Sequence, residues 1–268
     1  MLPAQPATAP VQPCRAHGVP AVLNSGSMAT FARDGINIHY EEHGSGFPVL
    51  LIAPGGMRSS APYWENTPWN PIEQLSPGYR IVAMDQRNAG QSTAPVSAGD
   101  GWDVYTADQF GLLDHLGIDR FAVLGMCIGG SYIANLIKTA PERVAAAVML
   151  QPIGLHDNRQ AFFDMFDAWA DELKPTHPDV GEEVWSSFQA NMYGSDNFIF
   201  TASTDDVATM TTPILVLMGD DLYHPQSTSR TLVGAAPNAT LIELWKEGDA
   251  RDRAMEAVAT FLDKHTSG

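Results

Sequence analysis

Short apolar runs recur along the chain with the lengths of buried β-strands. Residues 36–42 (INIHYEE) alternate apolar and polar side chains, which is typical of a strand with one solvated face. The remaining runs are almost continuously apolar, which favours strands that are covered on both faces. These runs span residues 47–53, 79–85, 120–126, 144–150, 213–219 and 239–245.

Helical patterns separate these strands. Residues 105–117 (YTADQFGLLDHLG) predict an amphipathic helix that ends at Gly117. Its predicted buried face consists of Ala107, Phe110, Leu113 and Leu116. Further helices are predicted at residues 131–144, 226–236 and 251–265. Because strands alternate with helices, the pattern predicts an α/β fold with a doubly wound, mostly parallel sheet.

One interval, from about residue 154 to about residue 211, is too long for a simple crossover between strands. It contains two amphipathic segments rich in Phe, Trp and Met, residues 158–175 and 180–194. We interpret the interval as an inserted helical lid. The predicted organisation is a flexible tail (1–28), an α/β core (29–152 and 210–268) and a helical lid (153–209).

The first 27 residues are rich in Pro and Ala and lack both a basic start and a continuous apolar segment of about 7–15 residues. We therefore expect a flexible tail rather than a signal peptide, and a cytoplasmic protein. No apolar run reaches about 18 residues, so the sequence predicts no membrane span. The two cysteines, Cys14 and Cys127, lie in contexts too different to predict a disulfide.

The length of 268 residues suits one large α/β domain with an insertion. The formal net charge of −16 argues against nucleic acid or an anionic membrane as a partner, because neither would gain counterion-release energy. We expect a small-molecule substrate, and the sequence is compatible with a homodimer. No nucleotide-binding glycine motif and no cluster of metal-ligating residues occurs, so no cofactor and no metal are predicted.

The sequence LGMCIGGS (residues 124–131) joins a predicted strand to a predicted helix. Its centre, Gly125-x-Cys127-x-Gly129, is typical of a sharp turn that exposes a nucleophile, because small neighbours relieve crowding. The N-terminus of the following helix favours a thiolate at Cys127 and a developing oxyanion. The backbone N–H of Ile128 is a candidate donor to that oxyanion. The alternative is a tight turn around a buried, inert cysteine.

Together with three further motifs, this turn resembles the α/β-hydrolase superfamily over roughly residues 30–264. The motifs are LLIAPGG (50–56), AMDQRNAGQS (83–92) and PILVLMGDDLYHP (213–225). The resemblance implies that Gly55 and Gly56 occupy the place of the family's oxyanion loop. It also implies a mainly structural role for residues 85–92, in which we expect Asp85 and Arg87 to hold each other.

The family places an Asp after the penultimate strand, with a Pro four residues later. Asp221 and Pro225 match this pattern, and Asp220 is the neighbouring alternative. The family's His usually follows the last strand, but residues 241–262 contain none, and His265 comes too late. His224 is the preferred replacement as base and His156 the second choice, since both loops follow the carboxyl ends of strands.

A cysteine depends less on a base than a serine does. A thiol with a pKa near 8.5 is already a few per cent thiolate at about pH 7, and a helix N-terminus lowers that pKa further. Cys127 without a His after the last strand is therefore chemically consistent with catalysis, and equally consistent with a decayed site.

Aromatic side chains in the predicted lid suggest an apolar or aromatic acyl group above Cys127. The predicted pocket residues are Met126, His156, Phe166 and Trp169. The leading hypothesis is a hydrolase of an ester, lactone or thioester that uses Cys127 as the nucleophile. Two alternatives remain open: an acyltransferase with a cysteinyl thioester, and a non-catalytic small-molecule-binding protein on a hydrolase scaffold.

Overall fold

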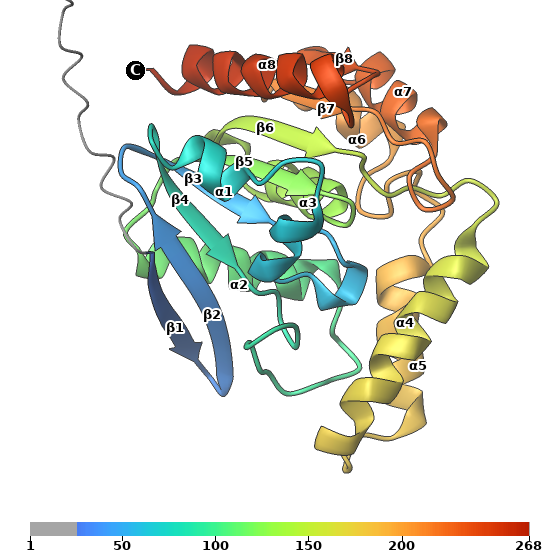
Figure 1. Cartoon of the computed structure of the whole chain (residues 1–268). Coiled ribbons are helices and arrows are strands. Elements are labelled where there is room, and N and C mark those ends of the chain that lie inside the picture. The colour runs from blue at the N-terminus through green and yellow to red at the C-terminus, as the bar shows by residue number, and fades with distance from the viewer. Residues whose placement is uncertain (1–25, 268) are drawn as a thin grey trace, which may run out of the picture.

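The computed structural model describes residues 26–267, and an eight-stranded sheet forms its centre (Figure 1). The strands are β1 (Ser27–Arg33), β2 (Ile36–His43), β3 (Phe47–Ile52), β4 (Tyr79–Met84), β5 (Phe121–Met126), β6 (Val144–Leu150), β7 (Ile214–Leu217) and β8 (Ala239–Ile242). They lie in the order β1-β2-β4-β3-β5-β6-β7-β8. The pairs β1–β2 and β2–β4 are antiparallel, and the other neighbouring pairs are parallel. The predicted doubly wound, mostly parallel α/β fold is confirmed.

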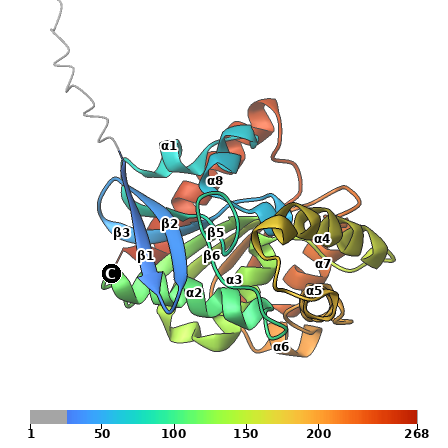
Figure 2. The ribbon, with the colours of Figure 1, turned by 90° about the horizontal axis from the view of Figure 1, so that it is seen from below.

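Helices cover both faces of this sheet. They are α1 (Pro71–Leu75), α2 (Trp102–His115), α3 (Gly129–Thr139), α4 (Arg159–Leu173), α5 (Glu182–Tyr193), α6 (Thr204–Ala208), α7 (Gln226–Ala235) and α8 (Gly248–Thr266). Four 3₁₀ turns complete them: η1 (Gly56–Arg58), η2 (Ala61–Asn66), η3 (Pro141–Arg143) and η4 (Lys174–Thr176). Figure 2 shows α1 and α8 on one face of the sheet, and α2 and α3 on the other.

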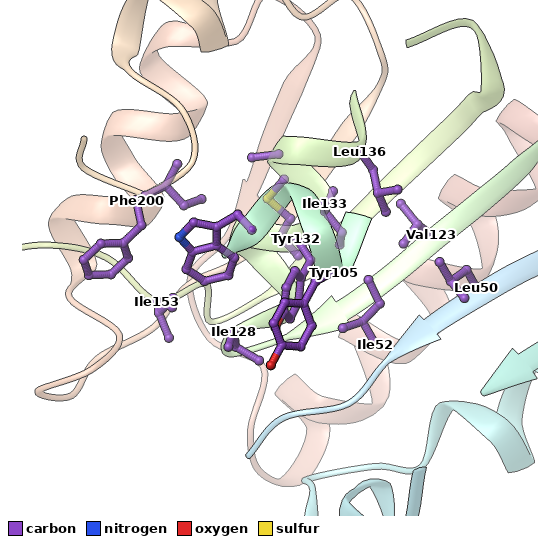
Figure 3. Packing of buried hydrophobic residues seen from close by; sticks show 14 of the residues in the cluster. Leu50, Ile52, Tyr105, Val123, Ile128, Tyr132, Ile133, Leu136, Ile153 and Phe200 are labelled. Atoms are coloured by element: carbon purple, nitrogen blue, oxygen red, sulfur yellow. The ribbon is translucent and has the colours of Figure 1, made fainter. Parts of the chain in front are cut away.

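Strand β3 shows why most of the predicted strands are apolar throughout. Leu50 and Ile52 belong to the core on the α2–α3 face, where Figure 3 shows them near Val123 of β5. Val49 and Leu51 belong to the core beneath α1 and α8. Successive side chains of a strand point to opposite faces, and both faces are covered, so residues 49–52 are all buried, while Phe47 and Pro48 at the start of the strand are partly buried.

Strand β1 is absent from the predicted strands. It forms a hairpin with β2, and Asp34 and Gly35 at the turn have positive φ values of 49° and 81°. Most of its side chains are exposed, so its apolar pattern is weak, although an Asp-Gly pair is a known hairpin signal. Ser27 and Met28 belong to this strand rather than to the predicted tail, and residues 1–25, Cys14 included, lie outside the described residues.

The predicted buried face of α2 is right in part, because Leu113 is buried and Phe110 and Leu116 pack, partly buried, against the core. Ala107 is exposed, whereas Asp108 and Gln109 are buried. Asp108 accepts two hydrogen bonds from Arg87, at 2.8 Å and 3.1 Å, and Gln109 donates to Gln86 at 3.0 Å. Buried polar groups are tolerated when they are paired, so these partners allow α2 to bury Asp108 and Gln109 in addition to its apolar side chains.

The expected pairing of Asp85 with Arg87 is also wrong. Arg87 bonds Asp108, while the carboxylate of Asp85 accepts backbone N–H groups of Ala61 and Gln91, each at 2.8 Å. Both side chains still stabilise the loop after β4, but they do so through different partners.

Two helices, α4 and α5, occupy the connection between β6 and β7. They pack against each other and lie to one side of the helical layers (Figure 1). Their bounds agree with the two amphipathic segments predicted there. That they act as a lid remains a prediction. Within residues 26–267, no helix combines the length and apolar character needed to cross a membrane.

Candidate active site

Cys127 lies directly after β5, at a sharp turn into α3. Its φ of 61° falls in the left-handed region, which side chains other than glycine rarely adopt. Its N–H donates to the carbonyl of Leu150 at 3.0 Å, and its own carbonyl accepts from the N–H of Ile153 at 3.1 Å. These two bonds hold the strained turn against the end of β6 and the segment that follows it.

Two glycines allow this turn to close. A Cβ atom at Gly125 would lie 3.0 Å from Cα of Gly129, and one at Gly129 would lie 3.0 Å from the carbonyl oxygen of Ile52. Larger side chains at either position would push the strand, the turn and the helix apart. The spacing of glycines around Cys127 therefore has a steric cause.

Asp221 and His224 form a close pair in the loop after β7. Nδ1 of His224 lies 2.7 Å from Oδ1 and 2.8 Å from Oδ2 of Asp221. The same carboxylate accepts the backbone N–H groups of Tyr223 at 3.0 Å and of His224 at 3.1 Å. Since Nδ1 donates to Asp221, Nε2 is the basic nitrogen of the neutral ring.

Gly219 makes room for His224. A Cβ atom at Gly219 would lie 2.5 Å from both the Cβ and the carbonyl oxygen of His224. The chain therefore folds back on itself between the end of β7 and the start of α7. In this fold His224 lines the same cavity as Cys127.

Cys127 and His224 act on each other electrostatically. Burial alone would raise the pKa of the Cys127 thiol, but His224 and the backbone amides at Gly55 and Ile128 together lower it. Burial would likewise lower the pKa of His224, but Cys127 and Asp221 raise it. Nε2 of His224 is buried and has no hydrogen-bond partner within residues 26–267, and His224 lines the same cavity as Cys127. These directions favour a thiolate–imidazolium pair.

The pKa of Asp221 moves in the direction that supports this pair. Burial would raise it, but the hydrogen bond and charge of His224, with the backbone N–H groups that the carboxylate accepts, hold it below its ordinary value. Asp221 is therefore ionised at neutral pH and stabilises a positive imidazole.

Backbone N–H groups converge on Cys127 from two segments. Gly55 and Gly56 have positive φ values of 118° and 59°, which bring their peptide groups close to the turn. Amides at Gly55 and Ile128 contribute to the lowered pKa of Cys127, so they stabilise negative charge at this point. The three residues predicted for an oxyanion hole thus lie together around the thiol.

A cavity of about 200 Å³ opens onto Cys127. Its lining residues come from the loops after β3, β5, β6 and β7 and from helices α4 and α5: Gly55, Gly56, Cys127, Ile128, Ile153, Phe162, Met165, Tyr193, Tyr223 and His224. Larger clefts, of about 290 to 440 Å³, exist elsewhere, but neither Cys127 nor His224 lines any of them. The lining is almost entirely apolar and carries no lysine, arginine, aspartate or glutamate among the described residues.

The four residues predicted for the pocket do not line this cavity: Met126, His156, Phe166 and Trp169. Phe166 and Trp169 instead pack against Phe188 of α5, with ring centroids 5.1 Å and 5.7 Å from it. The cavity side of α4 carries Phe162 and Met165, three residues apart, and sequence reasoning missed Met165 altogether. The spacing of apolar residues cannot separate these two faces of α4, since both are apolar.

The remaining alternatives for acid and base lie elsewhere. Asp220 forms an ion pair with Lys246, so Asp221 rather than Asp220 is the partner of His224. His156 does not line the cavity. In the segment after β8, Trp245 is buried and its indole N–H donates to the carbonyl of Met218 at 2.8 Å.

Metal ligation receives no support from the geometry. In the part of the chain that the structure describes, no group of three or more His, Cys, Asp or Glu side chains is arranged to hold a metal ion.

Comparisons with known proteins agree with the fold. A family model described as alpha/beta hydrolase fold matches residues 48–201. A non-heme haloperoxidase of Rhodococcus erythropolis is 27% identical over 247 residues, which cover 78% of this chain and 88% of that protein. Carboxylesterase YbfK of Bacillus subtilis (strain 168) is 23% identical over 201 residues, which cover 67% and 66%. The solved enol-lactonase from Burkholderia xenovorans LB400 superposes with a TM-score of 0.63 at 22% identity, over 87% of this chain and 99% of that one, which is a likeness of fold.

Proposed function

This chain belongs to the family with the alpha/beta hydrolase fold, and we propose that it hydrolyses a small, neutral ester, lactone or thioester through an acyl intermediate on Cys127. One observation carries the proposal. Asp221 bonds Nδ1 of His224, and His224 lowers the pKa of Cys127 beside a group of backbone donors. This is the relation between acid, base and nucleophile that acyl transfer requires.

In the first half of the reaction, His224 takes the thiol proton and the Cys127 thiolate attacks the carbonyl carbon. An S–C bond forms, and the π electrons of the carbonyl move onto its oxygen. Backbone N–H groups at Ile128 and at the Gly55–Gly56 loop stabilise that oxyanion. When the carbonyl reforms, the bond to the leaving alcohol or thiol breaks, and the His224 imidazolium protonates the leaving group.

In the second half, water replaces the leaving group. His224 takes a proton from water as the water oxygen attacks the thioester carbonyl. The second oxyanion collapses, the acid product leaves, and Cys127 returns as a thiolate next to the His224 imidazolium. Asp221 keeps the imidazole in the tautomer that presents Nε2 and stabilises its positive charge in both halves.

His224 also weakens the case for a non-catalytic binding protein. The motive for that alternative is the missing His after the last strand. Here the loop after β7 supplies both the acid and an imidazole, so no His is needed after β8. The arrangement supports a working base rather than a decayed site.

The cavity supports a narrow class of substrates. A volume of about 200 Å³ is below the range of about 300–1,000 Å³ that holds drug-sized ligands. The aromatic and aliphatic lining favours a short-chain or single-ring acyl group, and the lack of charged lining residues disfavours an anionic one. Two relatives are named as a carboxylesterase and an enol-lactonase, which is consistent with oxygen esters as substrates.

Acylation of Cys127 tests this proposal. With p-nitrophenyl acetate, we expect a burst of p-nitrophenol release and one acetyl group on the peptide that contains Cys127, found by mass spectrometry. Cys127→Ala should lose the burst and at least about 10³-fold of the turnover. Full turnover by Cys127→Ala, or an acetyl group found at another residue, would show that Cys127 is not the nucleophile.

A further inference from the structure

The proposed mechanism uses neither of the two tyrosines that line the cavity, and Tyr193 is the more deeply buried of them. Tyr193 is the last residue of α5, lines the cavity with Cys127, and is fully buried (0% exposed). Besides Cys127 and His224, the polar side chains that line this cavity are those of Tyr193 and Tyr223. A hydroxyl group buried in apolar surroundings is costly unless it meets an acceptor.

The Tyr193 hydroxyl meets a weak acceptor. It donates to Sδ of Met57 at 3.6 Å, which is its one hydrogen bond within residues 26–267. A thioether sulfur is a poor acceptor, so this bond is easily exchanged for a better one. Met57 directly follows Gly56, so the hydroxyl lies next to the loop that supplies backbone donors to the site.

The same hydroxyl lies within the field of the nucleophile. Burial raises the pKa of Tyr193 well above its ordinary value, and the negative charge of Cys127 raises it further. The phenol therefore keeps its proton at any pH at which the site works. It therefore remains a donor, on a residue that lines the same cavity as Cys127.

The ring of Tyr193 is held in place before any substrate binds. It stacks on Phe162 at 5.2 Å between centroids and meets Trp102 edge-on at 5.9 Å and Phe200 edge-on at 5.3 Å. The side chain of Arg159 donates to its backbone carbonyl. A donor that is already fixed costs no reorganisation when charge develops.

We propose that the Tyr193 hydroxyl donates a hydrogen bond to the carbonyl oxygen of the substrate as that oxygen becomes an oxyanion. The inference rests on the proposed function and adds a third donor, from α5, to the backbone donors of Ile128 and Gly55. On binding, the hydroxyl exchanges the sulfur of Met57 for an oxygen that gains charge. Because the new bond strengthens as charge develops, it stabilises the transition state more than the ground state.

The variant Tyr193→Phe removes the hydroxyl and keeps the ring. With p-nitrophenyl acetate we expect kcat to fall about 10- to 100-fold while KM changes less than about three-fold. The pH midpoint of Cys127 alkylation should stay where it is, because Tyr193 is not among the groups that set the pKa of the thiol. The matched control is Tyr132→Phe, which removes the hydroxyl of a buried tyrosine of α3 outside the cavity and should leave kcat unchanged.

A second variant separates donation to substrate from a structural role of the O–H···S bond. Met57→Leu also breaks that bond but keeps the hydroxyl, so we expect it to retain at least about a third of the wild-type kcat. Propionaldehyde gives a readout besides turnover. The Cys127 thiolate adds to its carbonyl carbon, and the π electrons move onto oxygen, giving a hemithioacetal oxyanion. We expect Tyr193→Phe to weaken propionaldehyde inhibition about 10-fold or more, and Met57→Leu to leave it within about three-fold.

Two results would overturn the inference. One is a Tyr193→Phe enzyme, folded by circular dichroism, with wild-type kcat and aldehyde inhibition. The other is an equal loss in Tyr193→Phe and Met57→Leu, which would assign the effect to the O–H···S bond. Failure of the proposed function would give another result: Cys127→Ala would then retain activity, both with Tyr and with Phe at position 193.

Discussion

Nδ1 of His224 lies 2.7 Å from Oδ1 of Asp221, and only two residues separate them in the chain. The turn that brings them together also directs the backbone N–H groups of Tyr223 and His224 at the same carboxylate. Acid and base therefore come from one loop, after β7. Residues 241–262, which follow or end the last strand, contain no His, and Trp245 in this segment is buried and donates to the carbonyl of Met218.

The charge of Asp221 is the first point to test. Asp221→Asn keeps the shape but loses the charge that raises the pKa of His224, so we expect kcat/KM to fall about 10²-fold. Asp220→Asn is the matched control, because Asp220 is the neighbouring carboxylate and pairs with Lys246. We expect it to keep wild-type kcat/KM. Equal losses in the two variants would remove the distinction between these carboxylates.

The pH dependence of kcat/KM should be bell-shaped. Activity rises as Cys127 loses its proton, below the ordinary thiol pKa because His224 and backbone amides lower that pKa. It falls as His224 loses its proton, above the ordinary imidazole pKa because Cys127 and Asp221 raise that pKa. Asp221→Asn should move the alkaline limb to lower pH and narrow the plateau. An alkaline limb that does not move would contradict the assigned role of Asp221.

Gly219 should be needed for the position of His224. A Cβ atom at Gly219 would lie 2.5 Å from backbone and Cβ atoms of His224, so Gly219→Ala must displace the turn. We expect at least a 10-fold loss in kcat/KM and a destabilisation of about 1–3 kcal/mol, measured by urea unfolding. Gly234→Ala in α7 is the control, because a Cβ there meets nothing within 4 Å. It should keep full activity and gain about 0.5–1 kcal/mol of stability.

Met165 should limit the length of the acyl group. Its side chain comes from α4, lines the cavity and lies against Gly56. Met165→Ala enlarges the cavity, so we expect the preference among p-nitrophenyl esters to shift from acetate toward butyrate and hexanoate. Met165 is only partly buried, so the cost in stability should be about 1–2 kcal/mol. Met255→Ala, on α8 and outside this cavity, should leave the ester preference unchanged. If Met165→Ala kept the ester preference of the wild type, the acyl group would have to bind elsewhere.

Hydrophobic pattern predicts this fold well because most of its strands are buried on both faces. The runs that form β3 to β7 are apolar at nearly every position, so they are visible without knowledge of their neighbours. The polar part of the buried face of α2 is not visible in this way. Asp108 is buried because Arg87, far from it in sequence, supplies its partner.

The candidate site likewise combines features that follow from local sequence with features that depend on distant parts of the chain. The turn at Cys127 is readable because its glycines are set by local sterics, and the acid and its neighbouring His lie within one short motif. The sequence prefers His224 to His156 and Asp221 to Asp220, but the contact between His224 and Asp221 depends on the direction of each side chain, which is set by turns such as that at Gly219. The cavity lining depends on how α4 and α5 are rotated, and their apolar residues occupy more than one face.

The central claim is that His224 makes a thiolate of Cys127, and the pH dependence of Cys127 alkylation by iodoacetamide tests it most directly. Peptide mapping separates this residue from Cys14, and His224→Ala is measured beside the wild type. We predict a wild-type midpoint well below about 8.5 and a higher midpoint in His224→Ala. The same midpoint in both proteins, at or above about 8.5, would contradict the account.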